Sequence, residues 1–415
     1  MKRTSLSLLL AVALTLQLTA VVSIVFSGCT TSPETESSVV VSAVQSVPES
    51  QPESSEVSIE ESKPEYDIDD IDELETKYFV KKLPKKLQKC FAVLYGCAKD
   101  HNDKVTFPEC VTDDELLTLM FLLNYDCPEL IHVSGDYHPE YSGKKQTPIE
   151  GVGLFFTMDE NKQKEANEQL DEYIETMRTH TKDMSEPEIE KYVYDSIFYG
   201  CTYNEGHEYA GSVYGALICG QARCEGLCKS FMWCMRKLGI ECMCVSGPQN
   251  WNSNAMYSDH SWDIVRINGE YYHLDLTLDD VRTSDEIKTE PNYGFYNVDD
   301  DTILQNHSIN TVFSEIGVPK CDSTDYNYHV MNNLLIRKGE NLRQRLNEIL
   351  GQHFRESGID PVSIKCEDEN DYITLGSESN IWIREFLAEY STADFKINTY
   401  TTELSRTLLI QAEMK

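Results

Sequence analysis

The sequence is poor in positive charge. Its 415 residues include 36 Lys and Arg against 70 Asp and Glu, which gives a formal net charge of −34. Binding to nucleic acid depends on clustered Lys and Arg that neutralise phosphates. The sequence therefore predicts no nucleic-acid partner, and an anionic membrane surface would repel the chain for the same reason.

Cysteine is plentiful, but no two cysteines between residues 219 and 244 form a Cys-x-x-Cys pair. The chain contains 14 Cys, and several of those in this stretch fall inside one expected helix. Because structural zinc sites usually draw on such pairs, the sequence predicts no metal site.

Residues 30–65 lack aromatic side chains and show no helical period. Ser, Glu, Pro and Val dominate this segment, which cannot bury enough apolar surface to offset its chain entropy. We predict an extended, acidic tether.

The first 29 residues predict export. A basic start at residues 2–3 precedes an apolar stretch over residues 6–26, and Ser27-Gly28 leads to Cys29. This is the layout of a signal peptide with a small-residue cleavage site. Its end resembles the lipobox of bacterial lipoproteins, which implies that Cys29 is lipidated and anchors the protein at the extracytoplasmic face of the cell membrane. An uncleaved transmembrane anchor is the alternative, because the apolar run is just long enough to span a bilayer.

After the tether, the length of the chain predicts two or three compact units. We divide it into an N-terminal mixed α/β unit (66–160), a catalytic domain (161–317) and a small C-terminal α+β unit (318–415). Hydrophobic periodicity predicts helices and strands in the outer units, namely helices over 84–98, 113–123 and 342–354 and strands over 131–133, 152–156, 362–366, 395–400 and 407–412.

In the middle unit, Cys224 is predicted to start a helix. Apolar residues keep helical spacing from Leu227 to Leu238, and Gly239 is a typical residue just past a helix end. Unpaired N–H groups and the positive dipole end favour a thiolate at such a position. Cys224 is therefore the candidate nucleophile, whereas Cys228, one turn further on, is expected to be a packed, inert thiol.

A hairpin follows this helix. Asn268-Gly269 is the preferred sequence of a two-residue turn, so we predict that Ile267 pairs with Glu270 and that opposed residue numbers sum to 537. His260 and Asp275 then share one face of the sheet as diagonal neighbours, which allows an imidazole–carboxylate hydrogen bond. His273 lies on the same face and is an alternative partner.

Four stretches together resemble the bacterial transglutaminase-like core over about residues 189–307. They are Arg223-Cys224-Glu225-Gly226, the helix end Leu238-Gly239-Ile240, His260-Ser261-Trp262, and Tyr271-Tyr272-His273-Leu274-Asp275. The segment 296–300 and His307 resemble the exit segment of that family, while Leu227-Cys228 departs from the usual Tyr-Ala.

This resemblance implies a papain-like α+β fold in which the helix bearing Cys packs on an antiparallel sheet. It also implies that Cys224 is the nucleophile, His260 the base and Asp275 the residue that orients it. We expect no cofactor, because a thiol, an imidazole and a carboxylate suffice for acyl transfer.

Two parts of the site stay open at this level. The backbone N–H of Cys224 is the natural first oxyanion donor, and Gln221 or Tyr214 is a candidate for the second. His207 and His307 are interpreted as structural residues.

The sequence thus favours an extracytoplasmic thiol acyl-transfer enzyme acting on amide bonds of proteins or peptides, cell-wall peptides included. The preference for hydrolysis over crosslinking is what the family resemblance implies. The alternative is a non-catalytic cell-surface binding module that retains the fold.

Overall fold

The computed structural model describes residues 74, 77–143, 148–249, 258–279, 290–358, 360–390 and 394–414. The chain separates into residues 1–64 and residues 65–415, and all described residues belong to the second unit. The predicted signal peptide, the lipidated Cys29 and the tether lie outside the described residues. None of the described helices has the length and hydropathy needed to cross a membrane.

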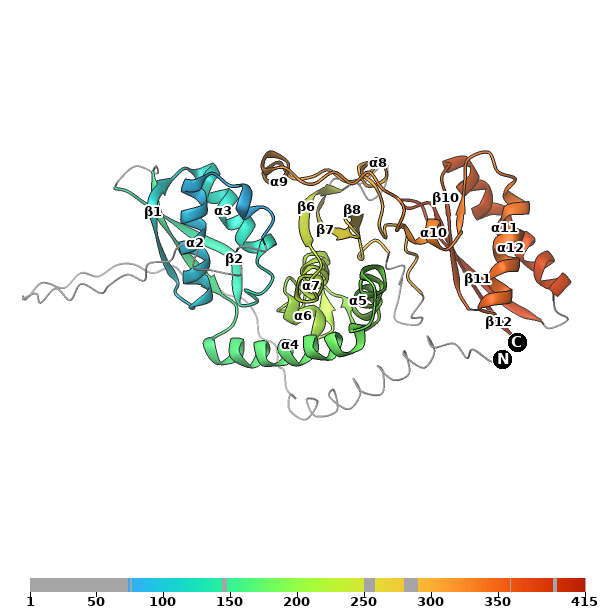
Figure 1. Ribbon diagram of the computed structural model, residues 1–415, viewed down its shortest axis with the longest axis horizontal. Coiled ribbons are helices and arrows are strands. Elements are labelled where there is room, and N and C mark those ends of the chain that lie inside the picture. Colours follow the sequence, from blue (N-terminus) through green and yellow to red (C-terminus); the bar gives the residue numbers. More distant parts are fainter. Residues whose placement is uncertain are drawn as a thin grey trace, which may run out of the picture. The chain divides into compact units, whose positions relative to one another are not determined.

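The N-terminal region combines two helices with a small antiparallel sheet (Figure 1). After the short 3-10 helix η3 (Val80–Lys82) come α2 (Lys85–Lys99), β1 (Lys104–Val111), α3 (Asp113–Asp126), β2 (Val133–Tyr141) and β3 (Ile149–Phe156). Thr112 caps α3 together with Glu115 in a capping box. Both predicted helices are confirmed, but β1 was not predicted, and residues 131–132 precede β2 instead of forming part of it.

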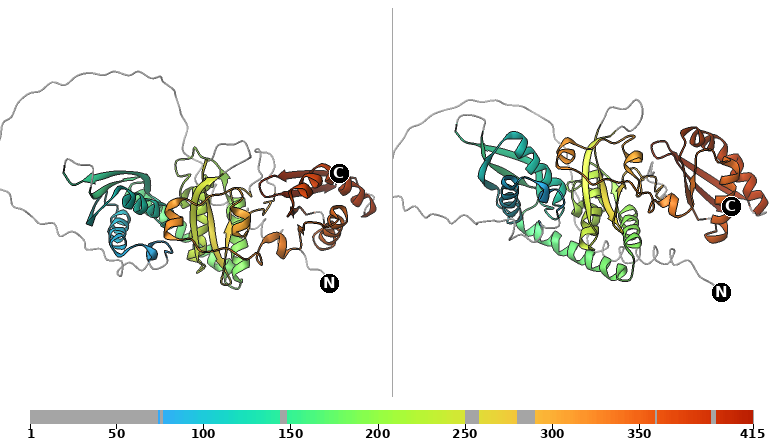
Figure 2. Two further views of the ribbon diagram at one scale, coloured as in Figure 1. Left: turned by 90° about the horizontal axis from the view of Figure 1, so that it is seen from above. Right: turned by 45° about the horizontal axis from the view of Figure 1, so that its top comes forward.

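The middle region places helices against a three-stranded antiparallel sheet in the order β6-β7-β8 (Figures 1 and 2). Its elements are α4 (Glu160–Thr181), α5 (Glu186–Gly200), β4 (Thr202–Tyr203), α6 (Val213–Leu217), β5 (Gln221–Ala222), α7 (Cys224–Lys237), β6 (Cys242–Gln249), β7 (Ser258–Ile267) and β8 (Glu270–Leu274). The fold is α+β, as predicted, and α7 begins at Cys224 and packs on the sheet.

The β7–β8 hairpin has the predicted register. Asn268 and Gly269 have φ values of 49° and 98°, which suit a type I′ turn. Ile267 pairs with Glu270, and the ladder continues to the pair Asp263 and Leu274. Opposed numbers therefore sum to 537, and Asp275 is the first residue past the ladder.

Residues 290–310, which we call the strap, run from one edge of this sheet to the other. At the β8 edge, His273 and Val298 exchange backbone hydrogen bonds. At the β6 edge, Ser308 N–H donates to Pro248 O and Asn310 N–H donates to Ser246 O. A Cβ on Gly247 would lie 1.9 Å from Ser308 O, so the close approach of the strap to β6 requires glycine there.

The C-terminal region follows three short helices, α8 (Asp300–Ile303), α9 (Thr311–Ile316) and α10 (Tyr328–Met331). Its four-stranded sheet has the order β11-β12-β10-β9, and two helices accompany it. The elements are β9 (Leu335–Ile336), α11 (Leu342–Glu356), β10 (Val362–Cys366), α12 (Glu369–Tyr390), β11 (Phe395–Thr402) and β12 (Thr407–Met414). The predicted helix and three strands are confirmed, whereas α12 was not predicted.

Three hydrophobic clusters hold these elements together. The first cluster contains residues from both the predicted N-terminal unit and the predicted catalytic domain. It joins the N-terminal helices to Val245, Trp262 and Ile264 on one face of the β6–β7 ladder. The second cluster contains α7 and the opposite face of the sheet, and the third belongs to the C-terminal region. The central sheet is therefore covered on both faces.

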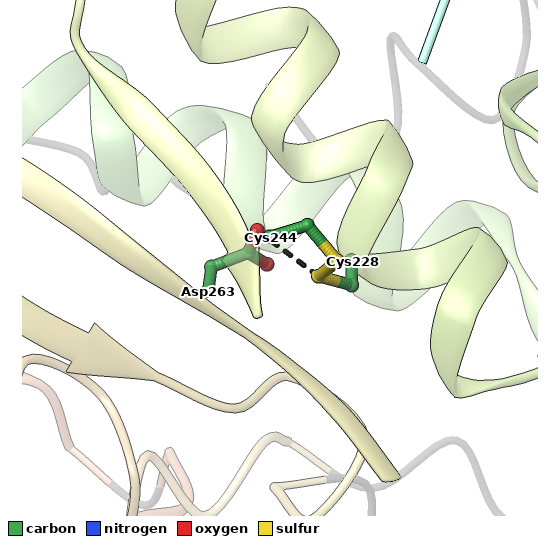
Figure 3. Close-up of side chains that lie close together, drawn as sticks. All are labelled: Cys228, Cys244 and Asp263. Atoms are coloured by element: carbon green, nitrogen blue, oxygen red, sulfur yellow. Dashed lines mark hydrogen bonds between the residues drawn. A yellow bond between two sulfur atoms is a disulfide. The ribbon is translucent and has the colours of Figure 1, made fainter. Parts of the chain in front are cut away.

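Cys228 is not a free thiol. It forms a disulfide with Cys244, which ties α7 to β6 beside the buried carboxyl of Asp263 (Figure 3). Burial raises the pKa of Asp263 well above its usual value, and the charge of Asp275 adds to the effect. The expectation of a packed, unpaired Cys228 was wrong because pairing depends on a strand that follows the helix in sequence.

Removing this disulfide should weaken the fold without removing the nucleophile. The bridge spans 16 positions of sequence, and closing a loop of that length stabilises a protein by about 3 kcal/mol. We expect Cys228→Ala to lower the free energy of unfolding by roughly 2–4 kcal/mol in urea titrations. Cys234→Ala is the matched control, because Cys234 is a buried, unpaired cysteine of the same helix. Dithiothreitol should reproduce the loss in the unaltered chain, and no effect of the reductant would contradict the assignment.

Candidate active site

Cys224 occupies the first position of α7, a helix of 14 residues. Arg223 before it is extended, and the Cys224 side chain is partly exposed. A Cβ on Gly226 would lie 2.1 Å from Ala210 O, so glycine in the sequence Cys-Glu-Gly lets the loop before α6 pass over the first turn. The side chain of Cys224 therefore lies at the positive end of the helix dipole.

His260 and Asp275 form a buried pair at one end of the sheet. His260 Nε2 lies 2.6 Å from Asp275 Oδ2, and both side chains are 1% exposed. Asp275 Oδ1 accepts a hydrogen bond from Leu278 N–H at 3.1 Å. Since Nε2 of His260 faces the carboxylate, its Nδ1 is the nitrogen left for the thiol, with which His260 also forms a hydrogen bond.

The charges of this pair stabilise each other. Burial alone would lower the pKa of His260, but the charge and hydrogen bond of Asp275, together with those of Cys224, raise it to about 10. Burial alone would raise the pKa of Asp275, yet the neighbouring imidazoles of His260 and His307 hold it well below its usual range. The Asp275 carboxylate thus favours the protonated form of His260.

His307 also contacts Asp275, which the sequence did not predict. Its Nε2 lies 3.1 Å from Asp275 Oδ2, the oxygen that His260 uses. The contact spans 32 residues of sequence, so no local pattern could reveal it. The other predicted structural histidine, His207, accepts a hydrogen bond from Tyr209 N–H at 3.2 Å in the loop before α6.

His273 is engaged elsewhere and is not the partner of His260. Its Nδ1 accepts the indole N–H of Trp262 at 3.1 Å, and its Nε2 lies 2.9 Å from Asp300 Oδ1. Cys321 lies close to this pair. A neutral imidazole whose Nδ1 accepts a hydrogen bond carries its proton on Nε2. Nε2 of His273 is therefore a donor to Asp300 and has no lone pair for a metal ion.

A cavity of about 490 Å³ opens between Cys224 and His260. Both residues line it, together with Tyr125, Tyr203, Glu205, Arg223, Glu225, Asp259 and Ser261. Tyr125 comes from α3, so the N-terminal region contributes a wall of the site that sequence reasoning had not assigned to it.

The first turn of α7 is held by Glu225. Its carboxylate pairs with Lys229 Nζ at 2.6 Å and with Arg223 Nη2 at 2.5 Å, and it accepts a hydrogen bond from Asn124 Nδ2 at 2.9 Å. Burial would raise the pKa of Glu225, but the charges of Lys229 and Arg223 lower it to about 2. Two cations therefore compensate the carboxylate that follows the nucleophile in sequence.

The oxygen atoms of the two proposed second oxyanion donors accept hydrogen bonds from other residues. Gln221 Oε1 accepts from Asn204 Nδ2 at 2.7 Å, and the Tyr214 hydroxyl accepts from Lys162 Nζ at 3.0 Å. Neither residue is among those that line the cavity. The backbone N–H of Cys224 stays the candidate for the first oxyanion donor.

Asp275→Asn should separate the role of the carboxylate from that of the thiol. The carboxylate raises the pKa of His260, so an amide in its place should lower that pKa and make His260 a weaker acceptor of the thiol proton. We expect the pH at which Cys224 first becomes alkylated by iodoacetamide to rise by roughly one to three units. Mass spectrometry of the tryptic peptide 224–229 measures it, with the exposed Cys110 as internal reference. If the pH at which alkylation of Cys224 begins did not change, Asp275 would have no effect on His260 and Cys224.

Comparisons with known proteins bear on this region of the chain. None of the curated proteins matches the sequence. The sequence profile of the Transglutaminase-like superfamily matches residues 170–276, a range that includes Cys224, His260 and Asp275 but not His307.

Two solved structures are similar at low identity. One is a protein from Cytophaga hutchinsonii named "Putative Cysteine Protease" (14% identity, TM-score 0.23), with 26% of this chain and 37% of that chain covered. The other is named a TGase (13% identity, TM-score 0.26), with 45% of this chain and 53% of that one covered. The chain thus spans about a third of the first structure and about half of the second. Residues 170–276 therefore match a transglutaminase-like core, and the antiparallel sheet behind α7 agrees with that match.

Proposed function

We propose that this protein is a thiol acyl-transfer enzyme that cleaves amide bonds of proteins or peptides through Cys224, His260 and Asp275. The observation that carries the proposal is the 2.6 Å contact between His260 Nε2 and Asp275 Oδ2, in a pair whose imidazole shares a cavity with Cys224. A nucleophile, a base and a residue that orients the base are the elements this chemistry requires.

The reaction follows from this arrangement. His260 takes the proton of Cys224, and the thiolate attacks the amide carbonyl carbon, while the Cys224 backbone N–H stabilises the resulting oxyanion. The His260 imidazolium then donates its proton to the leaving amine as the C–N bond breaks, which leaves a thioester on Cys224. Water, deprotonated by His260, attacks the thioester, and the carboxylic acid leaves as the thiol is restored.

Asp275 remains ionised through these steps. Its carboxylate fixes the tautomer of His260, with the proton on Nε2 and the lone pair on Nδ1 toward the thiol, and it stabilises the imidazolium. Hydrolysis is proposed in preference to crosslinking, and the substrate class is a protein or peptide amide, cell-wall peptides included.

We propose further that the enzyme is held at the extracytoplasmic face of the cell membrane by a lipid on Cys29. The support is the sequence of residues 1–29, with a basic start, an apolar run and Ser27-Gly28-Cys29. The acidic segment that follows would then act as a spacer between the membrane and the enzyme.

Cys224→Ala should abolish amide turnover and leave the fold intact, because it removes the nucleophile but little volume. Incubation with a peptide or cell-wall library should yield a covalent thioester adduct on the unaltered chain and none on the variant. Cys219→Ala is a matched control, since Cys219 is a partly exposed thiol on the approach to the same helix. Equal turnover in the Cys224 variant would reject Cys224 as the nucleophile, whereas no turnover by the unaltered chain would favour the non-catalytic binding module.

Cys29→Ala should abolish lipid labelling and release the protein from the membrane fraction, because a single lipid is the proposed anchor. Metabolic labelling with a fatty-acid analogue and fractionation of cells measure the two effects. Retention of the variant in the membrane would favour an uncleaved apolar helix instead.

A further inference from the structure

We infer that His307 is a positioning residue: its imidazole holds the Asp275 carboxylate against His260 by donating to the same carboxylate oxygen. The inference rests on the proposed function of Cys224, His260 and Asp275 and adds a fourth member to that set. His307 lies outside the part of the chain that matches the transglutaminase-like profile.

The contacts of His307 hold its imidazole ring in a single orientation. Its side chain is fully buried, with Nε2 at 3.1 Å from Asp275 Oδ2. On the other side of the ring, Nδ1 lies 3.2 Å from Ile303 O and 2.5 Å from Asn306 Oδ1. The ring also packs edge-on against Trp262, with 4.8 Å between centroids. Both nitrogens are thus engaged, and the ring cannot turn away without breaking two sets of contacts.

His307 is the hydrogen-bond donor in its contact with Asp275. An ionised carboxylate only accepts hydrogen bonds, so this contact requires a proton on His307 Nε2. The Asn306 amide can then turn its NH₂ group toward the unprotonated Nδ1. Asp275 Oδ2 then receives two donors, from His260 and His307, while Oδ1 receives Leu278 N–H. With donors on both oxygens the carboxyl group has no freedom to rotate away from His260.

The strap determines where His307 lies. Its backbone is fixed to the β6 edge through the bridge between His307 and Gln249 and through Ser308 N–H to Pro248 O. At the opposite edge, Asp275 N–H donates to Phe295 O in the same strap. The strap therefore forms two hydrogen bonds with Asp275: Phe295 O accepts from its backbone N–H, and the imidazole of His307 contacts its carboxylate. This is the arrangement expected of a support for a working carboxylate, and ordinary packing would not require a donor at the shared oxygen.

The other titratable groups near His307 are His260 and His273 from the two strands of the hairpin. His273 is directed to Asp300, so Asp275 and His260 are the groups whose behaviour should change with His307.

The test compares His307→Leu with His307→Gln in the full chain. Leucine removes the donor, whereas glutamine keeps an N–H of similar reach. In the leucine variant we expect the onset of Cys224 alkylation by iodoacetamide to move up by about one pH unit and amide turnover to fall about tenfold or more through kcat, with KM little changed. In the glutamine variant, the pH at which alkylation begins and the rate of amide turnover should both be close to those of the unaltered chain. His329→Leu is the control, because His329 is equally buried but bonds Ser363 Oγ at 3.0 Å in the C-terminal region.

Thermal unfolding of each variant shows whether the fold is intact, and the glutamine variant keeps the test valid if leucine prevents folding. An onset in folded His307→Leu equal to that of the unaltered chain would overturn the inference, as would equal shifts in both variants. Failure of the glutamine variant to fold would also overturn it, because the residue would then be structural. If Cys224 of the unaltered chain were no more reactive than Cys110, the proposed function itself would fail, and that result is separate from the others.

Discussion

The ionised carboxylate of Asp275 is the group on which the arrangement of this site depends. A carboxylate that is 1% exposed loses nearly all of its hydration, and burying an unpaired charge would cost several kcal/mol. Three donors offset that cost: two imidazoles at Oδ2 and a backbone N–H at Oδ1. Each donor comes from a different part of the chain, so the carboxylate is satisfied only when the hairpin, the turn after β8 and the strap are all in place.

Part of the site could be predicted from the sequence because it depends on local geometry. The Asn268-Gly269 turn fixes its own geometry through two residues with positive φ, and this sets the register of every pair in the hairpin. His260 and Asp275 meet as a consequence of that local rule. The helix start at Cys224 was equally local, because the apolar spacing up to Gly239 and the glycine that ends the helix belong to one continuous segment.

What sequence could not give depends on segments that meet only in the folded chain. His307 lies 32 residues from Asp275 and is carried there by a strap with no strand of its own. Cys228 forms a disulfide with Cys244 because β6 lies along α7. With 14 cysteines in the chain, their spacing in the sequence does not identify this pair. The sequence could not place Gln221 or Tyr214 relative to Cys224, and neither residue lines the cavity. Tyr125 reaches the cavity through packing of α3, which the proposed unit boundaries had separated from it.

A chain with a formal net charge of −34 is an unfavourable setting for a reactive thiolate, because the surrounding negative potential disfavours a further anion. The residue next to Cys224 is itself a glutamate, which would add to that repulsion if it stood alone. Its pairing with Lys229 and Arg223 removes most of the effect, and the protonated His260 offers a positive charge within reach of the sulfur. Solvent and salt screen the distant carboxylates, whereas the buried contacts are screened far less. If Cys224 is the nucleophile, as proposed, the paired side chains of Glu225, Lys229 and Arg223 are the charged groups that follow or adjoin it in the first turn of α7.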